Sequence, residues 1–503
     1  MLRIQDDSLN TLKSFFDPSS IAVIGVSRER EKPGYVIFSL LMENKKKGVL
    51  KAKVYPVNPF INEISGVKVY PSIKDIPSSV ELAIIVVPAS IVPKIMKECG
   101  EKGVKAAIVI SAGFSEIGNY KLEEEVKRIA KEGGIRVIGP NCIGVLSPPT
   151  GVDTIFLPTY KVLEDGKRVL STPRPRPGHV ALISQSGAFG TVAMDYMAGE
   201  GIGLSAFVSY GNKMDVDEAD LLEYFARDEN TRVVLMYIES IERGRKVVEV
   251  AKKVSLKKPI IAIKAGRTKA GARAAASHTA ALAGVDEIYD AAFRRSGIIR
   301  AYDMEELFDK AKALVMQPPS RGDRIAIVTD GGGAGVMATD MAETLGLKVP
   351  ELKGDARREL EEYRKRGILL KFSSVTNPID LTGSATSDMF VETLKALMKT
   401  NEIDTVIILA LHQVPGIKDP VKLAREIGKL VKDYNFPKPV LAVDTGWSEA
   451  AVLERREFDR NCIPSYPIPE RAVKGAKALY EYGYYLKREG ELDKYLNNWF
   501  PYT

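Results

Sequence analysis

The chain contains little cysteine and no long apolar run. Its three cysteines, among 503 residues, are far apart and form no CxxC pair: Cys99, Cys142 and Cys462. This pattern excludes a disulfide framework and a thiolate metal site, and we expect all three to be small buried hydrophobic residues. No apolar stretch approaches the roughly 20 residues of a membrane-spanning helix, and the acidic start MLRIQDDSLN is unlike a signal peptide. We therefore expect a cytoplasmic protein with no membrane segment.

Two common phosphate-binding motifs are also missing. The Walker pattern GxxxxGKS or GxxxxGKT does not occur, which excludes a P-loop kinase or ATPase at the level of motifs, and no complete GxGxxG supports an ordinary NAD site. The net charge is +7, from 72 basic and 65 acidic residues, and no stretch concentrates basic side chains among aromatic ones. We expect no nucleic-acid partner. A small phosphorylated ligand is compatible with this charge.

The alternation of apolar runs predicts the fold class. Short β-branched runs alternate with amphipathic stretches of helical length, the pattern of parallel strands joined by crossover helices. The first third of the chain has five such runs, at residues 21–26, 53–58, 82–87, 106–110 and 136–139. Because the chain is also too long for one hydrophobic core, we predict an α/β fold of three doubly wound domains.

Proline-rich segments indicate where these domains divide. A stretch rich in proline and charge around residues 173–177 precedes a new strand, and Pro318 and Pro319 precede another strand and its glycine-rich turn. We predict domains at residues 1–150, 151–318 and 319–503, the last of which ends in helices.

Ligands of open parallel sheets bind outside the carboxyl ends of the strands, so candidate residues are sought there. The first predicted domain has four turns at such ends, which contain Gly25, Ser27, Asn58, Pro59, Val87, Pro88, Ser111, Ala112 and Gly113. All four turns fall on one edge of the sheet, as in a pocket for a nucleotide-type ligand. Ordinary loop chemistry explains each turn equally well when it is taken singly.

Glycine-rich turns follow strands in the other two domains. In ISQSGAFG, residues 183–190, Ser184, Ser186 and Gly187 place two hydroxyls and bare amides at a helix N-terminus, which is a good cradle for phosphate. TDGGGAG, residues 329–335, makes a similar turn. For this second turn, ligand contact and a plain strand-to-helix connection are both open.

Any imidazole chemistry must use one of three histidines. A zinc site would have to bring all three together from distant parts of the chain, and we expect His179 and His412 to be structural. His278 lies in GARAAASHTAALAG, where small neighbours leave the ring accessible. A neutral imidazole can accept a phosphoryl group if a carboxylate holds its other nitrogen, and Glu239, at the end of the strand VVLMYIE, is the candidate. The alternative for His278 is a capping or packing role.

A series of short motifs carries a resemblance to a known family over nearly the whole chain. They are IAVIGVSRE, YPVNP, IVVP, SAGFSE, GPNCIG, ISQSGAFG, YIES, SHTAALAG, IVTDGGGAG and NPIDLTGS. In this order they resemble the alpha subunits of the ADP-forming acyl-CoA synthetases, relatives of succinyl-CoA synthetase. The resemblance implies a Rossmann-like domain that binds coenzyme A, followed by two flavodoxin-like ligase domains.

The resemblance also implies roles for the candidate residues. His278 matches the phosphorylated histidine and Glu239 the glutamate that stabilises it, while Ser184, Ser186 and Gly187 match the loop that faces the phosphate. The nine turn residues of the first domain match the CoA-lining positions. One departure is Ala280, where the family often has glycine, and a methyl group there restricts the backbone of the loop.

The implied reaction needs a partner. Acyl-CoA and phosphate give an acyl phosphate, His278 takes the phosphoryl group, and ADP on a separate ATP-grasp beta subunit receives it, giving ATP and free acid. We expect an α2β2 assembly in which the partner holds ADP or ATP with Mg²⁺, and no metal ligands in this chain.

Two rival functions remain. A noncatalytic CoA or acyl-CoA sensing scaffold of the same fold is the first, and the presence of both His278 and Glu239 argues against it. A CoA-dependent oxidoreductase or acyltransferase using only the first domain is the second; it would need a dinucleotide fingerprint or an added acyltransferase domain, and the sequence shows neither.

Overall fold

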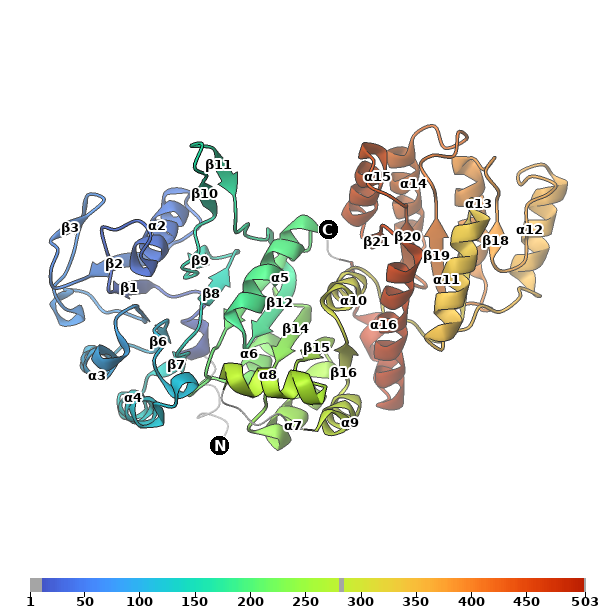
Figure 1. Cartoon of the computed structure of the whole chain (residues 1–503). Coiled ribbons are helices and arrows are strands. Elements are labelled where there is room, and N and C mark those ends of the chain that lie inside the picture. The colour runs from blue at the N-terminus through green and yellow to red at the C-terminus, as the bar shows by residue number, and fades with distance from the viewer. Residues whose placement is uncertain (1–10, 280–284, 502–503) are drawn as a thin grey trace. The chain divides into compact units, whose positions relative to one another are not determined.

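The computed structural model describes residues 11–279 and 285–501. These residues form two compact units, the first reaching Arg300 and the second beginning at Ala301. Three main sheets of mostly parallel strands organise them, two in the first unit and one in the second, with helices packed on the sheets (Figure 1). The predicted α/β class with three doubly wound sheets is confirmed.

The first sheet has five parallel strands in the order β2, β1, β5, β6, β7. The strands are β1 (Ser20–Ile24), β2 (Lys53–Val57), β5 (Leu82–Ile85), β6 (Ala106–Val109) and β7 (Arg136–Ile138). They are connected through α2 (Pro33–Lys46), α3 (Val92–Lys102) and α4 (Tyr120–Glu132), the hairpin β3 (Glu63–Ile64) with β4 (Val67–Lys68), and the 3₁₀ turns η1 (Ile73–Asp75), η2 (Ala89–Ile91) and η3 (Ser115–Ile117). Every residue of β1, β5 and β6 is buried, as expected for strands covered on both faces.

The second sheet has seven strands in the order β16, β15, β14, β12, β13, β8, β9. The strands are β8 (Gly144–Ser147), β9 (Val152–Asp153), β12 (Pro177–Ser184), β13 (Leu204–Ser209), β14 (Val233–Ile238), β15 (Ile260–Lys264) and β16 (Ile298–Ala301). Its helices are α5 (Gly187–Gly199), α6 (Glu218–Arg227), α7 (Gly244–Ser255), α8 (Lys269–Thr279) and α9 (Asp286–Ser296). Strands β8 and β9 pair antiparallel and lie on either side of residue 150, where the sequence predicts a domain boundary.

The third sheet has five parallel strands in the order β18, β17, β19, β20, β21. The strands are β17 (Ile325–Thr329), β18 (Ile379–Asp380), β19 (Thr405–Leu409), β20 (Val440–Val443) and β21 (Ser465–Tyr466). Its helices are α10 (Met304–Met316), α11 (Gly332–Thr344), α12 (Asp355–Lys365), α13 (Ser387–Lys399), α14 (Pro420–Asp433), α15 (Glu449–Arg460), α16 (Pro469–Arg488) and α17 (Leu492–Asn497). Helix α10 packs on α16, so it belongs to the second unit although it precedes Pro318.

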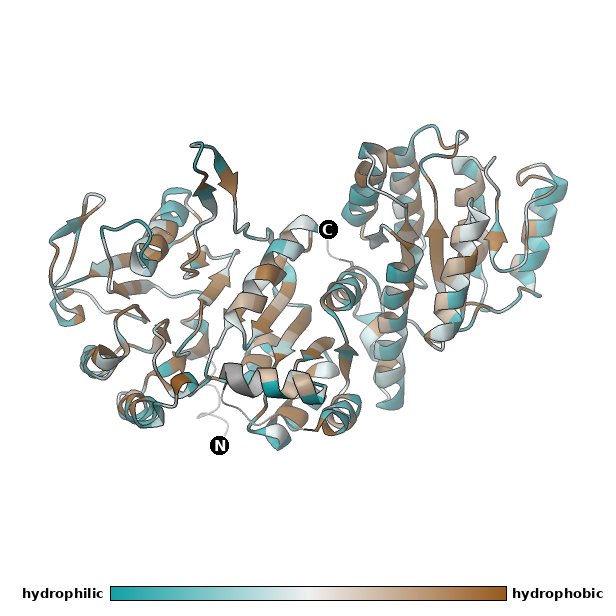
Figure 2. Ribbon diagram, viewed as in Figure 1, coloured by the Kyte–Doolittle hydropathy of each residue, from teal (hydrophilic) through white to brown (hydrophobic). Residues whose placement is uncertain are grey.

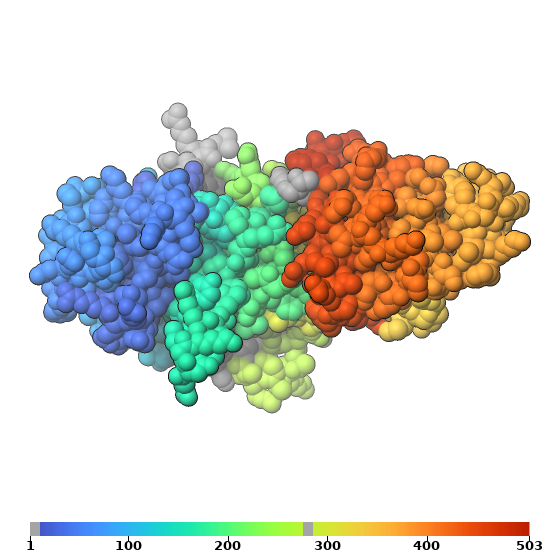
Figure 3. Space-filling view, turned by 90° about the horizontal axis from the view of Figure 1, so that it is seen from above, coloured from blue at the N-terminus to red at the C-terminus, as the bar shows by residue number. Residues whose placement is uncertain are grey.

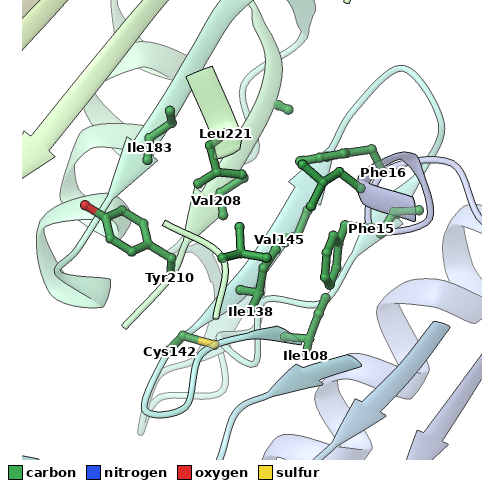
Figure 4. Packing of buried hydrophobic residues seen from close by; sticks show 14 of the residues in the cluster. Phe15, Phe16, Ile108, Ile138, Cys142, Val145, Ile183, Val208, Tyr210 and Leu221 are labelled. Carbon is green, nitrogen blue, oxygen red and sulfur yellow. The ribbon is translucent and has the colours of Figure 1, made fainter. Parts of the chain in front are cut away.

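One hydrophobic core joins the first and second sheets. Phe15 and Ile108 pack in the same cluster as Val145, Val208 and Tyr210, and all five are buried (Figure 4). Burying a side chain of this size stabilises a fold by about 1.5–3 kcal/mol. The shared core explains why two sheets form a single compact unit.

Hydrophobic and polar residues are distributed differently between the strands and the helices. The strands are mostly hydrophobic, and polar residues gather on the helices (Figure 2).

The hairpin of β10 (Tyr160–Val162) and β11 (Arg168–Leu170) projects from the first unit, where Val162 is 71% exposed (Figure 3). Cys99, Cys142 and Cys462 are buried, as predicted. Among the residues that the structure describes, no helix is long and apolar enough to cross a membrane.

Candidate active site

A cavity of about 760 Å³ lies in the first unit, beside the carboxyl ends of strands from both of its sheets. The turns after β5 and β6 supply one part of its lining, and the loops after β12 and β14 supply another. The lining from these four places includes Val87, Pro88, Ser111, Ala112, Gln185, Ser186, Gly187 and Ser240. The structure thus brings four of the nine sequence-predicted residues of the first domain together with the glycine-rich turn of the second.

Five of the predicted residues of the first domain lie outside this lining. Gly25, Ser27, Asn58, Pro59 and Gly113 do not line the cavity. Asn58 Nδ2 donates to the carbonyl of Val26 at 2.7 Å, which ties together the turns that follow β1 and β2. Gly25 has φ +99°, and a Cβ there would lie 2.2 Å from the carbonyl oxygen of Val86. Asn58 therefore holds two strand-end turns together, and Gly25 allows the close approach of the Val86 carbonyl.

Ser111 joins the two turns that do face the cavity. Its hydroxyl donates to the carbonyl of Val87 at 2.5 Å, so the ends of β5 and β6 are held together. Cys142 also lines the cavity, but its thiol donates to the carbonyl of Val109 at 3.3 Å and burial raises its pKa to about 12. A thiol with so high a pKa is not a nucleophile at neutral pH.

The turn after β12 presents a helix N-terminus to the cavity. Ser186 is the N-cap of α5, and its hydroxyl accepts from the N–H of Phe189 at 3.3 Å. Ser184 is fully buried, and its hydroxyl donates to the carbonyl of Ser186 at 2.6 Å, so it holds the turn from behind. A Cβ on Gly187 would lie 2.7 Å from Cγ2 of Ile143. Glycine at this position therefore lets the first turn of α5 reach the cavity wall.

Gln185 fastens this turn to the end of β14. Its Oε1 accepts from the backbone N–H groups of Glu239 and Ser240 at 2.9 and 3.0 Å, and its Nε2 donates to Ser240 Oγ at 3.1 Å. The N–H of Gln185 also donates to the carbonyl of Tyr237 at 3.1 Å. The position of Glu239 relative to the turn thus depends on one amide side chain. The sequence analysis missed Gln185; its signal was a large polar residue between two serines at a strand end.

Glu239 is 5% exposed and follows β14 directly. Burial raises the pKa of Tyr237 to about 12, and the charge of the Glu239 carboxylate and a hydrogen bond from Tyr237 to it contribute to the shift. The Tyr237 ring stacks on Phe189 of α5 at a centroid distance of 4.1 Å. Glu239 is therefore held from its backbone by Gln185 and at its side chain by Tyr237.

A buried lysine brings positive charge to the cavity wall. Lys213 lines the cavity, and its Nζ donates to the carbonyl of Ser240 at 2.7 Å and to Glu218 Oε1 at 3.0 Å. Tyr210 donates to the same oxygen at 3.1 Å. Burial raises the pKa of Glu218, and the charge of Lys213 opposes that rise. The lysine and the N-terminus of α5 make this wall receptive to an anion.

His278 belongs to helix α8 by its backbone, whereas its side chain lies outside the described residues, as does Ala280. Helix α8 contacts η3, and Ser115 of η3 lines the cavity. The helix that carries His278 is therefore adjacent to the cavity wall.

Comparisons with known proteins agree with this architecture. Three family models match in chain order: a CoA binding domain at residues 19–148, a succinyl-CoA ligase like flavodoxin domain at 177–314 and a ligase-CoA domain at 325–484. The chain is 42% identical over 478 residues to the acetate–CoA ligase (ADP-forming) I subunit alpha of Pyrococcus furiosus, covering 94% of this chain and 98% of that one. The chain belongs to the family of ADP-forming acetate–CoA ligase alpha subunits.

Other members of this acetate–CoA ligase family extend the similarity. A solved structure of a dinucleotide-forming acetyl-coenzyme A synthetase 1 from Ca. Korarchaeum cryptofilum, in complex with phosphate and ADP, is 40% identical with a TM-score of 0.85 and covers 95% of this chain and 98% of that one. The ADP-forming acetate–CoA ligase of Methanocaldococcus jannaschii is 38% identical over 97% of this chain, but the match covers only 65% of the relative. The family is thus shared by separate alpha subunits and by longer chains.

Membership of the ligase family places the cavity within its matched domains. The turns after β5 and β6 fall in the CoA binding domain, and Gln185, Ser186, Glu239 and His278 fall in the flavodoxin-like domain. Coenzyme A is accordingly a ligand of this chain's first domain.

Proposed function

We propose that this chain is the catalytic alpha subunit of an NDP-forming acyl-CoA synthetase, which converts acyl-CoA, ADP and phosphate reversibly into a carboxylic acid, ATP and CoA. The observation that carries the proposal is the shared cavity. It places the CoA-domain turns at Val87 and Ser111 in one space with the N-terminus of α5. An acyl thioester and an attacking phosphate need such a meeting point.

The residues of the cavity suit the first step. An oxygen of phosphate attacks the thioester carbonyl, the C–S bond breaks, and acyl phosphate and CoA thiolate are formed. The first-turn N–H groups of α5, the Ser186 hydroxyl and the Lys213 ammonium lie where they would stabilise the phosphate and the developing negative charge. Lys127 of α4 also lines the cavity and would neutralise phosphates of CoA.

His278 would perform the second step. An imidazole nitrogen attacks the phosphorus of acyl phosphate, the P–O bond breaks, and the carboxylic acid leaves. Glu239 would hold the other imidazole nitrogen and stabilise the charged phosphohistidine, because its own position is fixed by Gln185 and Tyr237. In the last step the terminal phosphate oxygen of ADP takes the phosphoryl group from the histidine, giving ATP.

We further propose that an ATP-grasp beta subunit supplies ADP or ATP with Mg²⁺, in an α2β2 assembly. The supporting observation is the difference between relatives. The Pyrococcus furiosus protein is named as a subunit alpha and is matched over 98% of its length, whereas the Methanocaldococcus jannaschii protein has no subunit in its name and is matched over 65%. The unmatched third of that longer chain is where we place the partner's equivalent.

The acid remains to be measured, because relatives are named for acetate, for 4-hydroxybutyrate and for trans-feruloyl-CoA. The test is ATP formation from a panel of acyl-CoA esters, ADP and phosphate, with the chain alone and with its co-expressed partner. We expect ATP only with the partner present. CoA binding by calorimetry without ATP formation from any ester, in an assembled complex, would instead support the scaffold function.

A further inference from the structure

The carboxyl edge of the third sheet holds a second group of chemically competent side chains. His412 lies shortly after β19, and Asp444 directly follows β20. Ser448 comes four residues later and is the N-cap of α15. Because β19 and β20 are adjacent and parallel, both loops leave the sheet at the same edge.

These three side chains form a continuous hydrogen-bonded series. His412 Nδ1 lies 2.8 Å from Asp444 Oδ1 and 3.0 Å from Oδ2, and His412 Nε2 lies 2.7 Å from Ser448 Oγ. Asp444 is fully buried, the His412 side chain is 9% exposed, and Ser448 is exposed to solvent. A buried carboxylate at Nδ1 holds the proton there, which leaves the lone pair of Nε2 facing the serine hydroxyl.

The helix start adds the groups that a negatively charged oxygen needs. Ser448 Oγ accepts from the N–H of Ala451 at 3.3 Å, so the hydroxyl sits in the positive field of the α15 N-terminus. The N–H groups of Glu449 and Ala450 are in the first turn, where helical hydrogen bonds do not use them. Donors of this kind stabilise the oxyanion of a tetrahedral intermediate.

The neighbouring groups keep this arrangement in place. Arg455 of α15 donates to the carbonyls of Asp444 and Gly446, at 2.6 and 2.9 Å, which fixes the loop that carries Ser448. Its guanidinium lies 5.2 Å from the ring centre of Trp447, which is 75% exposed beside Ser448 and offers an apolar surface to an acyl group. The Asp330 carboxylate at the end of β17 accepts from the N–H of Leu411.

Two more carboxyl groups lie at this edge. Glu454 of α15 is buried near Asp444, and Asp380 ends β18. Burial and the charge of the neighbouring Asp444 raise the pKa of Glu454. The described residues include no group of three or more such side chains placed to hold a metal ion. A histidine between a buried carboxylate and an exposed serine hydroxyl is the arrangement of a nucleophilic serine.

We propose that Ser448, His412 and Asp444 form a serine acyl-transfer site in the third domain, which hydrolyses small activated acyl esters and thioesters. Ser448 Oγ attacks the acyl carbonyl while His412 Nε2 takes its proton, and the C–O or C–S bond breaks as that proton passes to the leaving group. Water then attacks the acyl-serine and gives its proton to Nε2. The free acid leaves and the serine regains its proton. Ser448 and His412 are the catalytic residues and Asp444 is a positioning residue.

The test uses the full chain with p-nitrophenyl acetate and, separately, a fluorophosphonate that labels activated serines. We expect hydrolysis that falls about 10²-fold or more in Ser448→Ala and in His412→Ala, and fluorophosphonate on the Ser448 peptide by mass spectrometry. Ser72→Ala is the matched control, because Ser72 is also an N-cap but its hydroxyl donates to Glu98. This control should hydrolyse the ester at the wild-type rate.

Asp444→Asn tests the positioning role by the pH–rate profile. We expect a lower rate and a midpoint at lower pH, because the imidazolium loses the negative charge beside it. An unlabelled Ser448 peptide in the folded wild-type chain would overturn the proposal, as would ester hydrolysis that persists in Ser448→Ala. The labelling experiment decides the matter even if a variant fails to fold.

Discussion

The second and third sheets have the same turn at one strand end of their carboxyl edges, but the ionisable groups around that turn differ. In the second sheet, Ser184 ends β12 and its hydroxyl donates to the carbonyl of Ser186 at 2.6 Å. In the third, Thr329 ends β17 and its hydroxyl donates to the carbonyl of Gly331 at 2.9 Å. Each turn leads directly into a helix, α5 or α11.

The residue inside each turn makes the difference. Gln185 accepts two backbone N–H groups with a neutral amide, whereas Asp330 accepts the N–H of Leu411 with a carboxylate. Lys213 adds positive charge beside the first turn, and Asp444 and Glu454 add acidic groups beside the second. The doubly wound fold supplies a helix N-terminus at both edges, and we infer that the neighbouring side chains decide whether an edge suits a phosphate.

The largest expected effect on activity comes from Glu239, the carboxylate at the carboxyl edge of the second sheet that we assign to catalysis. Glu239→Gln keeps the shape of the side chain but removes the charge that would stabilise phosphohistidine. We expect ATP formation by the complex with its partner to fall about 10²- to 10⁴-fold. Glu249→Gln on the exposed surface of α7 is the control and should change nothing. Wild-type rates for Glu239→Gln would remove Glu239 from the mechanism.

The next test places a carboxylate at the edge of the second sheet, at the position that matches Asp330 of the third sheet. Gln185→Glu puts a carboxylate where Asp330 has one, close to the proposed phosphate. We expect ATP formation to fall about 10²-fold, since the new charge repels phosphate and weakens an electrostatic cradle. Gln185→Met removes the hydrogen bonds without adding charge, and its activity should lie between those of Gln185→Glu and wild type. Equal losses of activity in Gln185→Glu and Gln185→Met would show that the hydrogen bonds of Gln185 matter and that an added charge does not.

The acidic edge of the third sheet predicts a pH dependence of stability. Burial raises the pKa of Asp330 to about 7 and that of Glu454 to about 10, from ordinary values near 4. A raised folded-state pKa contributes stability below the unfolded pKa, and this stability is lost as the pH rises through the folded value. The melting temperature of the second unit should therefore fall between about pH 5 and pH 10.

Glu454→Gln isolates the upper part of this dependence, because an amide cannot lose a proton. We expect the difference in melting temperature between the variant and wild type to move in the variant's favour from pH 7 to pH 10, as read by calorimetry of the full chain. A difference that does not change with pH would show that Glu454 does not titrate in the folded state.

The smallest effects compare the turn glycines. A Cβ at Gly187 would lie 2.7 Å from Ile143 Cγ2, and one at Gly331 would lie 2.6 Å from Leu411 Cδ1. We expect each alanine variant to lose about 1–3 kcal/mol in the free energy of unfolding, because a side chain must shift to make room. Gly333, with nothing within 4 Å, is the control, and alanine there should be neutral or stabilise by up to about 1 kcal/mol. Denaturant titration measures all three.

The sequence predicted the elements better than their assembly. Apolar runs located the central strands, such as β5 within residues 82–87, because strands buried on both faces are continuous and hydrophobic. We predicted no strand at β8 or β9, and their pairing beside β13 places them in the second sheet. The core shared by Phe15 and Tyr210 depends on contacts between residues nearly 200 positions apart in the sequence.

The same limit applies to the sites. Strand-end turns pointed to Val87, Ser111 and Ser186, which do line the cavity. The hydrogen bond between Gln185 and Ser240 joins residues 55 positions apart, and the contact of His412 with Ser448 joins residues 36 positions apart. Neither pair is local in the sequence, so no short motif predicts it. We expected His412 to be structural because it stands at the end of an apolar strand. Because β19 and β20 are adjacent and parallel, Asp444 and Ser448 lie beside His412 in the fold.

The most direct test of the central claim is phosphorylation of His278. The chain would be incubated with acyl-CoA, phosphate, Mg²⁺ and the proposed ATP-grasp partner, beside a His278→Ala control, and examined by intact and peptide mass spectrometry. We expect an acid-labile phosphate on the His278 peptide, which is absent from the control and is lost when ADP is added and ATP appears. A complex that binds CoA and forms ATP with no phosphate on this peptide, or one that binds CoA and forms neither, would contradict it.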